Sequence, residues 1–412
     1  MMKAGGYVRG IALSGVALAS VLALRCSNGN GNGGGEAGPE FDRNALLASV
    51  GENVILPTYA EFEEAATTLD ERASAWSDAV EAGEDIDAAR MDAQQAWREA
   101  MDVWQRAELL QVGPAGPAGE AVGGESLRDE IYSWPESVNP CRVDQELVAN
   151  AFEEDGFFDG ALVNVYGLDA LEYLLFYSEA ENSCAPQVSI NADGSWEALD
   201  AMQLQQRRAT YAAAVAERLL EDAQRLHDAW DPDEGDFLGD FAQAGEDGSA
   251  YESARRAVDD LFAAMFYLDT VTKDQKLAEP TGIAESCSQA PCLDAVESPW
   301  AEHSKENVAN NLRGFLHIMR GEMPDEGEGP GFDAALGMVD AQDLADTMLD
   351  DTEAAIDSLD AVEGRFTEAL QDDLESVRDV HAAVKAITDN LKMELVMRLG
   401  LQVPMSGGGD TD

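Results

Sequence analysis

The stretch GALVNVYGLDALEYLLFY at residues 160–177 is apolar on nearly every face of the helix that it predicts. A helix of this kind is normally buried on all sides. Other helices must therefore surround it. The rest of the sequence can supply them, because it has few alternating β-branched runs and many long segments rich in Ala, Leu, Glu, Asp and Arg. The sequence predicts an all-α fold.

The predicted helices fall into two groups. We expect helices at residues 58–82, 86–111, 142–154, 160–178, 197–230, 249–276, 303–320, 333–359 and 363–399. A Cys- and Pro-rich connection at residues 279–302 is expected to separate an N-terminal helical bundle, residues 46–278, from a C-terminal bundle, residues 303–405, which an acidic tail follows at 406–412. The predicted architecture is two packed helical bundles.

The start of the chain has the order of a signal peptide. A basic beginning precedes an apolar stretch at residues 11–24, which is too short to span a bilayer comfortably, and Cys26 follows it. The residues before Cys26 approximate a lipobox. We therefore expect a signal peptide at residues 1–25, acylation of Cys26, and a flexible tether over residues 26–45. Arg25 stands where a lipobox has a small residue, which leaves simple secretion as the alternative.

The chain is strongly acidic. It has 81 Asp and Glu residues against 26 Lys and Arg residues, and its formal net charge is −55. Such a surface repels phosphate backbones and anionic lipid headgroups. We therefore expect no nucleic-acid partner, and contact with the membrane only through the lipid anchor. The acidity itself is interpreted as a solvated surface.

Four cysteines remain once Cys26 is set aside: Cys141, Cys184, Cys287 and Cys292. An even number in an exported chain favours two disulfides. Three connectivities are possible, and we favour Cys141 with Cys184 and Cys287 with Cys292. A four-thiolate zinc site is the alternative, although the sequence has no Cys-x-x-Cys pair.

The polar exceptions in the predicted buried helix indicate a site. Asp169 and Glu172 are three residues apart, so both lie on one side of that helix. Glu108 continues an apolar stripe of an earlier helix, and Asp129 follows with Arg128 beside it. A buried carboxylate must be paired, protonated or metal-bound. Acids that converge without histidine favour an oxygen-bound cation or a shared proton, and pairing with arginine is the alternative.

Other patterns of catalytic or metal chemistry have little support. The histidines form no His-Glu-x-x-His motif, and His303 with Glu306 is expected at an exposed helix start. The acidic loop at residues 231–236 suggests calcium, but Ala242 stands where an EF-hand needs glutamate. There is no Gly-x-Ser-x-Gly motif for a serine nucleophile.

At the residues of the predicted site the sequence resembles the imelysin family. The matching pieces occur in order: Trp97, Trp104 and Glu108, the segment Tyr132–Pro135 (YSWP), Gly167–Phe176 (GLDALEYLLF), Lys276–Pro280 (KLAEP) and Glu297–Leu312. The resemblance covers roughly residues 50–405. It implies a two-bundle helical fold, export to the bacterial envelope, frequent lipid anchoring, a link to iron acquisition, and a relation to M75 peptidases and iron-uptake periplasmic proteins.

The family's site is a Gly-x-His-x-x-Glu motif, which this chain matches in part. Gly167 and Glu172 match, whereas Asp169 stands at the histidine position and offers oxygen in place of nitrogen. We expect an envelope lipoprotein that binds a metal ion or a metal-bearing ligand through Glu108, Asp129, Asp169 and Glu172, and that works with iron-uptake components. The resemblance favours iron over zinc or calcium. An M75-type metallopeptidase and a partner-binding helical module without metal are the alternatives.

Overall fold

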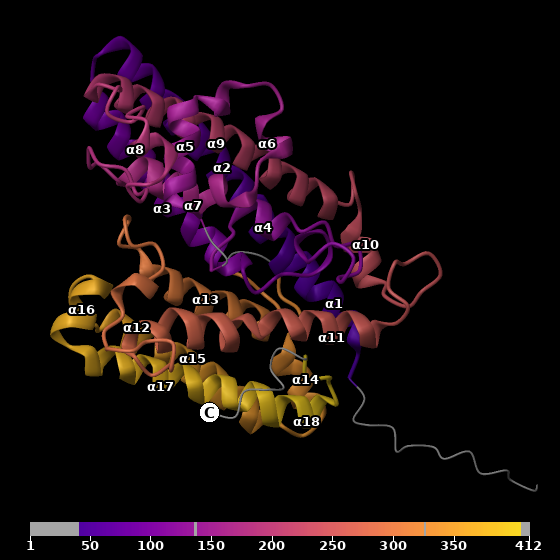
Figure 1. The fold of residues 1–412 in the computed structure, drawn as a ribbon. Helices are drawn as coiled ribbons and strands as arrows, with labels where there is room; N and C mark the ends of the chain where they lie inside the picture. Colours follow the sequence, from indigo (N-terminus) through magenta and orange to yellow (C-terminus); the bar gives the residue numbers. More distant parts are fainter. Residues whose placement is uncertain (1–40, 136–137, 325–326, 405–412) are drawn as a thin grey trace, which may run out of the picture. The chain divides into compact units, whose positions relative to one another are not determined.

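The computed structural model describes residues 41–135, 138–324 and 327–404 (Figure 1). Every regular element within these ranges is helical, which confirms the predicted all-α fold. None of the described helices combines the length and the apolar character needed to cross a membrane. The predicted signal peptide, Cys26, most of the tether and the acidic tail lie outside the described residues.

Long helices alternate with short helical segments along the chain. The first half of the chain contains α1 (Arg43–Val50), η1 (Gly51–Ile55), α2 (Leu56–Ala82), α3 (Ile86–Ala107), η2 (Gly113–Ala115), α4 (Leu127–Ile131), α5 (Pro140–Ala149), η3 (Ala151–Glu153), α6 (Phe157–Gly160), η4 (Val163–Val165), α7 (Gly167–Phe176), α8 (Ser189–Ala192) and α9 (Ala201–Trp230). The second half contains α10 (Phe237–Ala242), α11 (Ala254–Met265), η5 (Leu268–Ala278), α12 (Glu279–Thr281), η6 (Leu293–Ala295), α13 (Ser304–Arg320), α14 (Phe332–Met338), α15 (Gln342–Asp360), α16 (Phe366–Asp372), α17 (Leu374–Asn390), η7 (Leu391–Leu395) and α18 (Val396–Leu399). Of the η elements, η1, η5 and η7 are π-helical.

The helix α7 occupies the position that its apolar sequence predicts. It packs against α3 and α9, and α2 lies along both of these helices. Nine of its residues, from Gly167 to Leu175, are buried. The indole of Trp97 on α3 donates a hydrogen bond of 2.7 Å to the carbonyl of Leu168. This packing holds the motif acids of α7 inside the protein.

The predicted helix at 160–178 is longer than the observed one. The chain forms the short turns α6 and η4 before α7 begins at Gly167, which has a φ of +85°. A Cβ atom at Gly167 would lie 2.9 Å from the carbonyl oxygen of Ile131. The left-handed backbone and this close approach both require glycine at this position. A continuous helix from residue 160 is therefore interrupted at Gly167, where α7 begins. Ahead of Gly167, Val165 and Tyr166 are buried but Leu162 is 72% exposed, so the expectation that the whole apolar stretch is buried is wrong for its first part.

The elements from η5 to α18 form a second set of packed helices. α13 contacts α15, α15 contacts α17, and η5 packs against α13 and α17 (Figure 1). Contacts between α3 and α13 join this set to the helices around α7. At this crossing Gly314 lies against α3, because a Cβ atom there would be 2.6 Å from the carbonyl oxygen of Arg106. The division into an N-terminal bundle at 46–278 and a C-terminal bundle at 303–405 stays a prediction. The element η5 belongs to the N-terminal bundle by its position in the sequence, but it packs against α13 and α17 of the C-terminal one.

Both predicted disulfides are confirmed. Cys141 is bonded to Cys184 with a Cα–Cα distance of 4.6 Å, and Cys287 to Cys292 with a Cα–Cα distance of 5.8 Å. The first joins α5 to the segment after α7, and the second closes a small loop after α12. All four cysteines are therefore used in disulfides, and the alternative of a four-thiolate zinc site does not hold.

Candidate functional site

Three of the four predicted site residues are buried, and the fourth is not. Asp169 and Glu172 on α7 have exposed fractions of 2% and 3%, and Glu108, at the C-terminus of α3, has 0%. Asp129 lies on the outer face of α4, and 55% of its side chain is exposed. The short helix buries Leu127, Arg128 and Ile131 instead. The structure thus brings Asp169, Glu172 and Glu108 inside and leaves Asp129 at the surface.

Glu108 is paired with Arg128. The guanidinium donates through Nε to Oε2 at 3.0 Å and through Nη2 to Oε1 at 3.2 Å, and Trp104 Nε1 donates to Oε1 at 2.7 Å. Burial raises the pKa of Glu108, and the nearby charge of Arg128 opposes that rise. Burial lowers the pKa of Arg128, but the charge and hydrogen bonds of Glu108, together with the charges of Tyr267 and Asp129, outweigh burial and raise that pKa overall. For Glu108 the arginine-paired alternative is therefore the observed one.

Arg128 also links this pair to its surroundings. Its Nη1 lies 3.2 Å from Oδ1 of Asp129, and its Nη2 donates a hydrogen bond of 2.6 Å to the carbonyl of Trp134. The single guanidinium group of Arg128 thus forms salt bridges with the buried Glu108 and with the exposed Asp129. It also fixes the Trp134 backbone, which forms a cis peptide bond with Pro135.

Asp169 is held by neutral donors. Oδ2 accepts hydrogen bonds from the hydroxyl of Ser133 at 2.6 Å and from the backbone N–H of Val138 at 3.1 Å, and Oδ1 accepts from the backbone N–H of Ala170 at 3.0 Å. Burial raises its pKa to about 6, although these hydrogen bonds favour the charged form. Asp169 takes part in none of the ion pairs of the described residues. Its charge therefore has no cationic partner in the part of the chain that the structure describes.

Glu172 is held in the same way. Its Oε1 accepts two backbone hydrogen bonds, from Trp300 and Ala301, each 2.8 Å long. Burial raises its pKa to about 8, and the nearby charges of Glu297 and Asp169 add to the rise. Glu172 therefore holds a proton at neutral pH, because a charged carboxylate without a cation is costly in a dry interior.

Glu297 is a further buried acid that the predicted ligand set omitted. Its exposed fraction is 1%, and its Oε1 accepts from Gln105 Nε2 at 3.1 Å, from the hydroxyl of Tyr132 at 2.8 Å and from Lys276 Nζ at 3.0 Å. Its other oxygen, Oε2, is buried without a hydrogen-bond partner among the described residues. Glu297 stands between η6 and α13, so no helical periodicity points to it. The only signal was its place in the stretch that resembles the imelysin family.

Lys276 supplies the cation beside Glu297. The π-helical η5 carries it, and its ammonium donates to Gln105 Oε1 at 2.6 Å and to Asn311 Oδ1 at 2.8 Å. Its Nζ lies 5.5 Å from the centre of a Trp134 ring. Burial lowers the pKa of Lys276, while the charge of Glu297 opposes the fall. Since Glu108 and Glu297 each have a cation, Asp169 and Glu172 are the two acids left to neutral donors.

Two surface cavities border this buried region. A cavity of about 750 Å³ is lined by Trp134, Pro135, Gln275 and the loop that the Cys287–Cys292 bridge closes. A second cavity of about 250 Å³ is lined by Arg128, Pro135 and Tyr267 among others. Trp134 thus lies between the larger cavity and the ammonium group of Lys276, whereas Arg128 itself reaches the smaller cavity.

His303 differs from its predicted position. It was expected at an exposed helix start, but it is 6% exposed and its Nε2 lies 2.9 Å from Oδ1 of Asp102. Its ring lies against Trp97, with the ring centres 6.0 Å apart. The packing of α13 against α3 buries it. As the side chains are placed in the described ranges, no group of three or more His, Cys, Asp or Glu could hold a metal ion.

Comparison with known proteins identifies the family. The family model for imelysin, of the peptidase M75 group, matches residues 55–393. The chain belongs to the imelysin family. Among solved structures, a candidate iron-regulated protein A precursor from Parabacteroides distasonis has a TM-score of 0.64 at 18% identity, over 88% of this chain and 96% of its own. An imelysin-like protein from Psychrobacter arcticum has a TM-score of 0.60 at 16% identity, over 90% of this chain and 100% of its own. No curated protein matches this chain.

The resemblance of this imelysin-family chain at its candidate site implies an altered motif. Gly167 and Glu172 occupy the motif's glycine and glutamate positions, and the acid at the histidine position, Asp169, is fixed by Ser133 and by backbone N–H groups. A carboxylate there offers only oxygen and can carry a proton at mildly acidic pH. The candidate site is a cluster of three buried acids, Asp169, Glu172 and Glu297, which we call the acid cluster.

Proposed function

We propose that this protein is a bacterial envelope protein that serves iron acquisition, and that its acid cluster takes up a cation in exchange for protons. One observation carries the proposal: Asp169 and Glu172 are buried with hydrogen-bond donors but without a cation, and Glu297 beside them has one oxygen without a partner among the described residues. Such a cluster must hold protons or gain a positive charge.

The donor chemistry suits a hard or borderline cation. Carboxylate oxygens are the preferred ligands of such ions, and metal binding to acids releases their protons. The acids are not placed as a ready metal cage among the described residues. Uptake therefore requires a carboxyl group to reorient. The sequence analysis also expects Glu108 and Asp129 among the metal ligands. Both form salt bridges with Arg128, so this proposal does not include them.

The cellular setting is part of the proposal. The two disulfides fit an oxidising compartment outside the cytoplasm. Acylation of Cys26 would attach the chain to a membrane as a lipoprotein, facing the periplasm or the cell surface. The description of the Parabacteroides distasonis neighbour as iron-regulated supports a role in iron acquisition beside other envelope components. Peptide hydrolysis is not proposed, because Asp169 replaces the motif histidine.

The test is cation binding by residues 40–412, measured by elemental analysis and by calorimetry with ferrous, ferric, zinc and calcium ions. We expect uptake of a cation by the unchanged protein and its loss in a variant with Asp169→Asn and Glu172→Gln. The matched control is Asp144→Asn. Asp144 is also buried, and burial raises its pKa to about 6, but it binds Tyr173 and Ser183 outside the acid cluster.

Three outcomes are distinguishable. Loss of binding in the Asp169→Asn, Glu172→Gln variant alone supports the proposal. Equal binding by all variants, or no binding by any, overturns it and leaves the acids as a structural network. Proteolysis of an unfolded substrate that a chelator abolishes would show that the protein is a metallopeptidase instead.

A further inference from the structure

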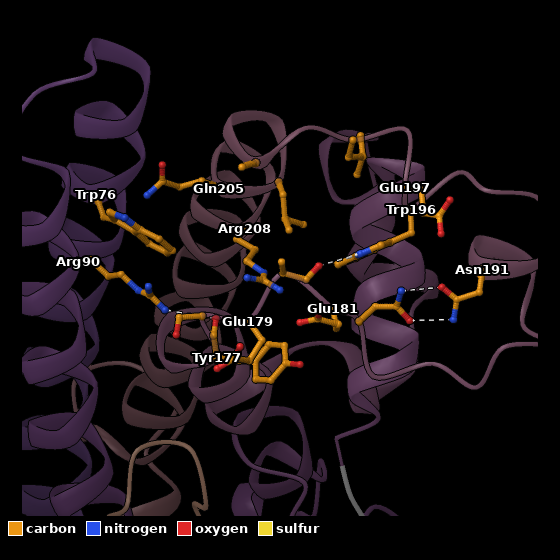
Figure 2. Close-up of a pocket in the computed structure, with 16 residues that line it drawn as sticks. Trp76, Arg90, Tyr177, Glu179, Glu181, Asn191, Trp196, Glu197, Gln205 and Arg208 are labelled. Carbon is orange, nitrogen blue, oxygen red and sulfur yellow. Dashed lines mark hydrogen bonds between the residues drawn. The ribbon is translucent and has the colours of Figure 1, made fainter.

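Another cavity, which none of the three acids of the acid cluster lines, lies where α2, α3 and α9 meet the segment after α7. Its volume is about 780 Å³, within the range of small-molecule sites. Figure 2 shows side chains from these separate elements facing one space. The wall formed by residues 177–199 is braced by two hydrogen bonds between Asn182 and Asn191, and by one of 3.0 Å from Trp196 Nε1 to the carbonyl of Ala180. The cavity is therefore built into the fold.

Two guanidinium groups line this cavity, and neither forms a salt bridge with an acid among the described residues, although the charge of Arg208 acts at longer range on the buried acid Asp144. Arg208 on α9 is 7% exposed, and its Nη2 has no hydrogen-bond partner among the described residues. Arg90 on α3 donates to the carbonyls of Leu175 and Tyr177, at 2.7 and 3.3 Å. Neither arginine takes part in the ion pairs of the described chain. Burial lowers the pKa of Arg90, and the charge of Arg208 lowers it further. An anionic group in the cavity would offset both the burial of Arg90 and the repulsion between the two guanidinium groups.

Aromatic rings hold the two guanidinium groups in place. The guanidinium carbon of Arg90 lies 5.6 Å from the ring centre of Trp76, and that of Arg208 lies 5.3 Å from the ring centre of Tyr177. Trp196 lines the cavity as well. A guanidinium group held against a ring face can still bind a carboxylate through its N–H groups: Nη2 of Arg208 is without a partner among the described residues, whereas Nε and Nη2 of Arg90 already donate to carbonyls, which leaves its Nη1 for a ligand. The rings also offer apolar surface to the body of a ligand.

The rim of the cavity has the opposite charge. Glu179, Glu181 and Glu197 line it and are exposed (Figure 2). A ligand that reaches the arginines with a carboxylate would place its other end near these acids, where a positive group is favoured. The formal net charge of −55 also repels simple anions, whereas a zwitterion has no net charge and is not repelled.

We propose that this cavity binds a small zwitterion with an apolar or aromatic body, the chemical class of the aromatic α-amino acids. Its carboxylate lies at Arg90 and Arg208, its body lies among Trp76, Tyr177 and Trp196, and its ammonium group faces the rim acids. The inference rests on residues separate from the acid cluster, so it stands or falls independently of cation binding.

The experiment is calorimetric titration of the full-length protein with L-phenylalanine and with two analogues that each lack one charge. Phenethylamine lacks the carboxylate and 3-phenylpropionate lacks the ammonium group. We expect L-phenylalanine to bind, with a change in the fluorescence of the cavity tryptophans, and each analogue to bind about 10- to 100-fold more weakly, since each loses hydrogen bonds to a charged partner.

Variants test the arginine directly. Arg208→Gln should weaken L-phenylalanine about 10-fold or more, and Arg208→Lys should restore part of the affinity because it keeps the charge. The matched control is Arg225→Gln, an exposed position on the same helix that pairs with Glu125 away from the cavity. Thermal unfolding of each variant shows whether it is folded. Absence of binding at millimolar L-phenylalanine, equal binding of the analogues, or unchanged affinity in folded Arg208→Gln overturns the proposal.

Discussion

Replacing Arg128 with methionine removes the partner of a fully buried acid. Glu108 is 0% exposed, and Arg128 gives it two charge-assisted hydrogen bonds, at 3.0 and 3.2 Å. Methionine fills much of the same volume without charge. The variant therefore leaves the Glu108 carboxylate hydrogen-bonded only by the neutral donors Trp104 and Gln111, with the charge of Lys276 acting on it from farther away.

The magnitude follows from this burial. Breaking a buried ion pair by removing one member costs about 3–5 kcal/mol of unfolding free energy. Because Trp104 and Gln111 still donate to Glu108, we expect the lower end, about 3 kcal/mol. Burial already raises the pKa of Glu108, and loss of Arg128 raises it further. A carboxyl group whose folded-state pKa exceeds its unfolded value loses stability as pH rises between the two values, so the cost is larger at pH 8 than at pH 5.

The assay is urea unfolding at pH 5 and at pH 8, followed by circular dichroism. A double variant, Arg128→Met with Glu108→Gln, should recover most of the lost stability, because no buried charge remains unpaired. The difference in stability loss between pH 5 and pH 8 should then disappear. A loss below about 1 kcal/mol for Arg128→Met, or an equal loss at both pH values, would refute the reasoning that this pair neutralises a buried charge.

Three further predictions concern other parts of the molecule. Burial raises the pKa of Glu172 from 4.5 to about 8, so stability should fall as pH rises between these values, and Glu172→Gln should remove on the order of 4 kcal/mol of that fall in unfolding titrations. Replacing Cys141 and Cys184 with serine opens a bridge of sequence separation 43 and should cost about 4 kcal/mol in the oxidised protein, measured by chemical denaturation. Gly314→Ala places a methyl group 2.6 Å from the carbonyl oxygen of Arg106 and should cost about 1–3 kcal/mol, seen as a lower melting temperature.

The sequence predicted the long helices well where periodicity and end signals agree. The helix expected at 303–320 is α13, Ser304–Arg320, which ends at Gly321 with a φ of +69°. The helix expected at 197–230 starts later, because Asp200 and Gln203 form a capping box in front of α9. The helix expected at 333–359 is divided into α14 and α15 near Asp340, whose φ is +57°. Such a break in a periodic stretch depends on packing rather than on composition.

The site was predictable only in part. Burial of Asp169 and Glu172 follows from the apolar faces of α7, and the inward direction of Glu108 follows from the stripe that it continues. The pairing of Glu108 with Arg128 was one of two alternatives, which only the structure separates. Glu297 joins the acid cluster from a segment more than a hundred residues away in sequence from α7, and no local pattern encodes such a contact.

Proton release on cation binding tests the central claim most directly. At pH 6.5, below the pKa of about 8 to which burial raises Glu172, that side chain holds a proton. Calorimetry in buffers of different ionisation enthalpy should show about one proton released for each cation bound to residues 40–412, and less release for Glu172→Gln. Cation binding without proton release, or with the same release in Glu172→Gln, would contradict the exchange of protons for a cation at the acid cluster.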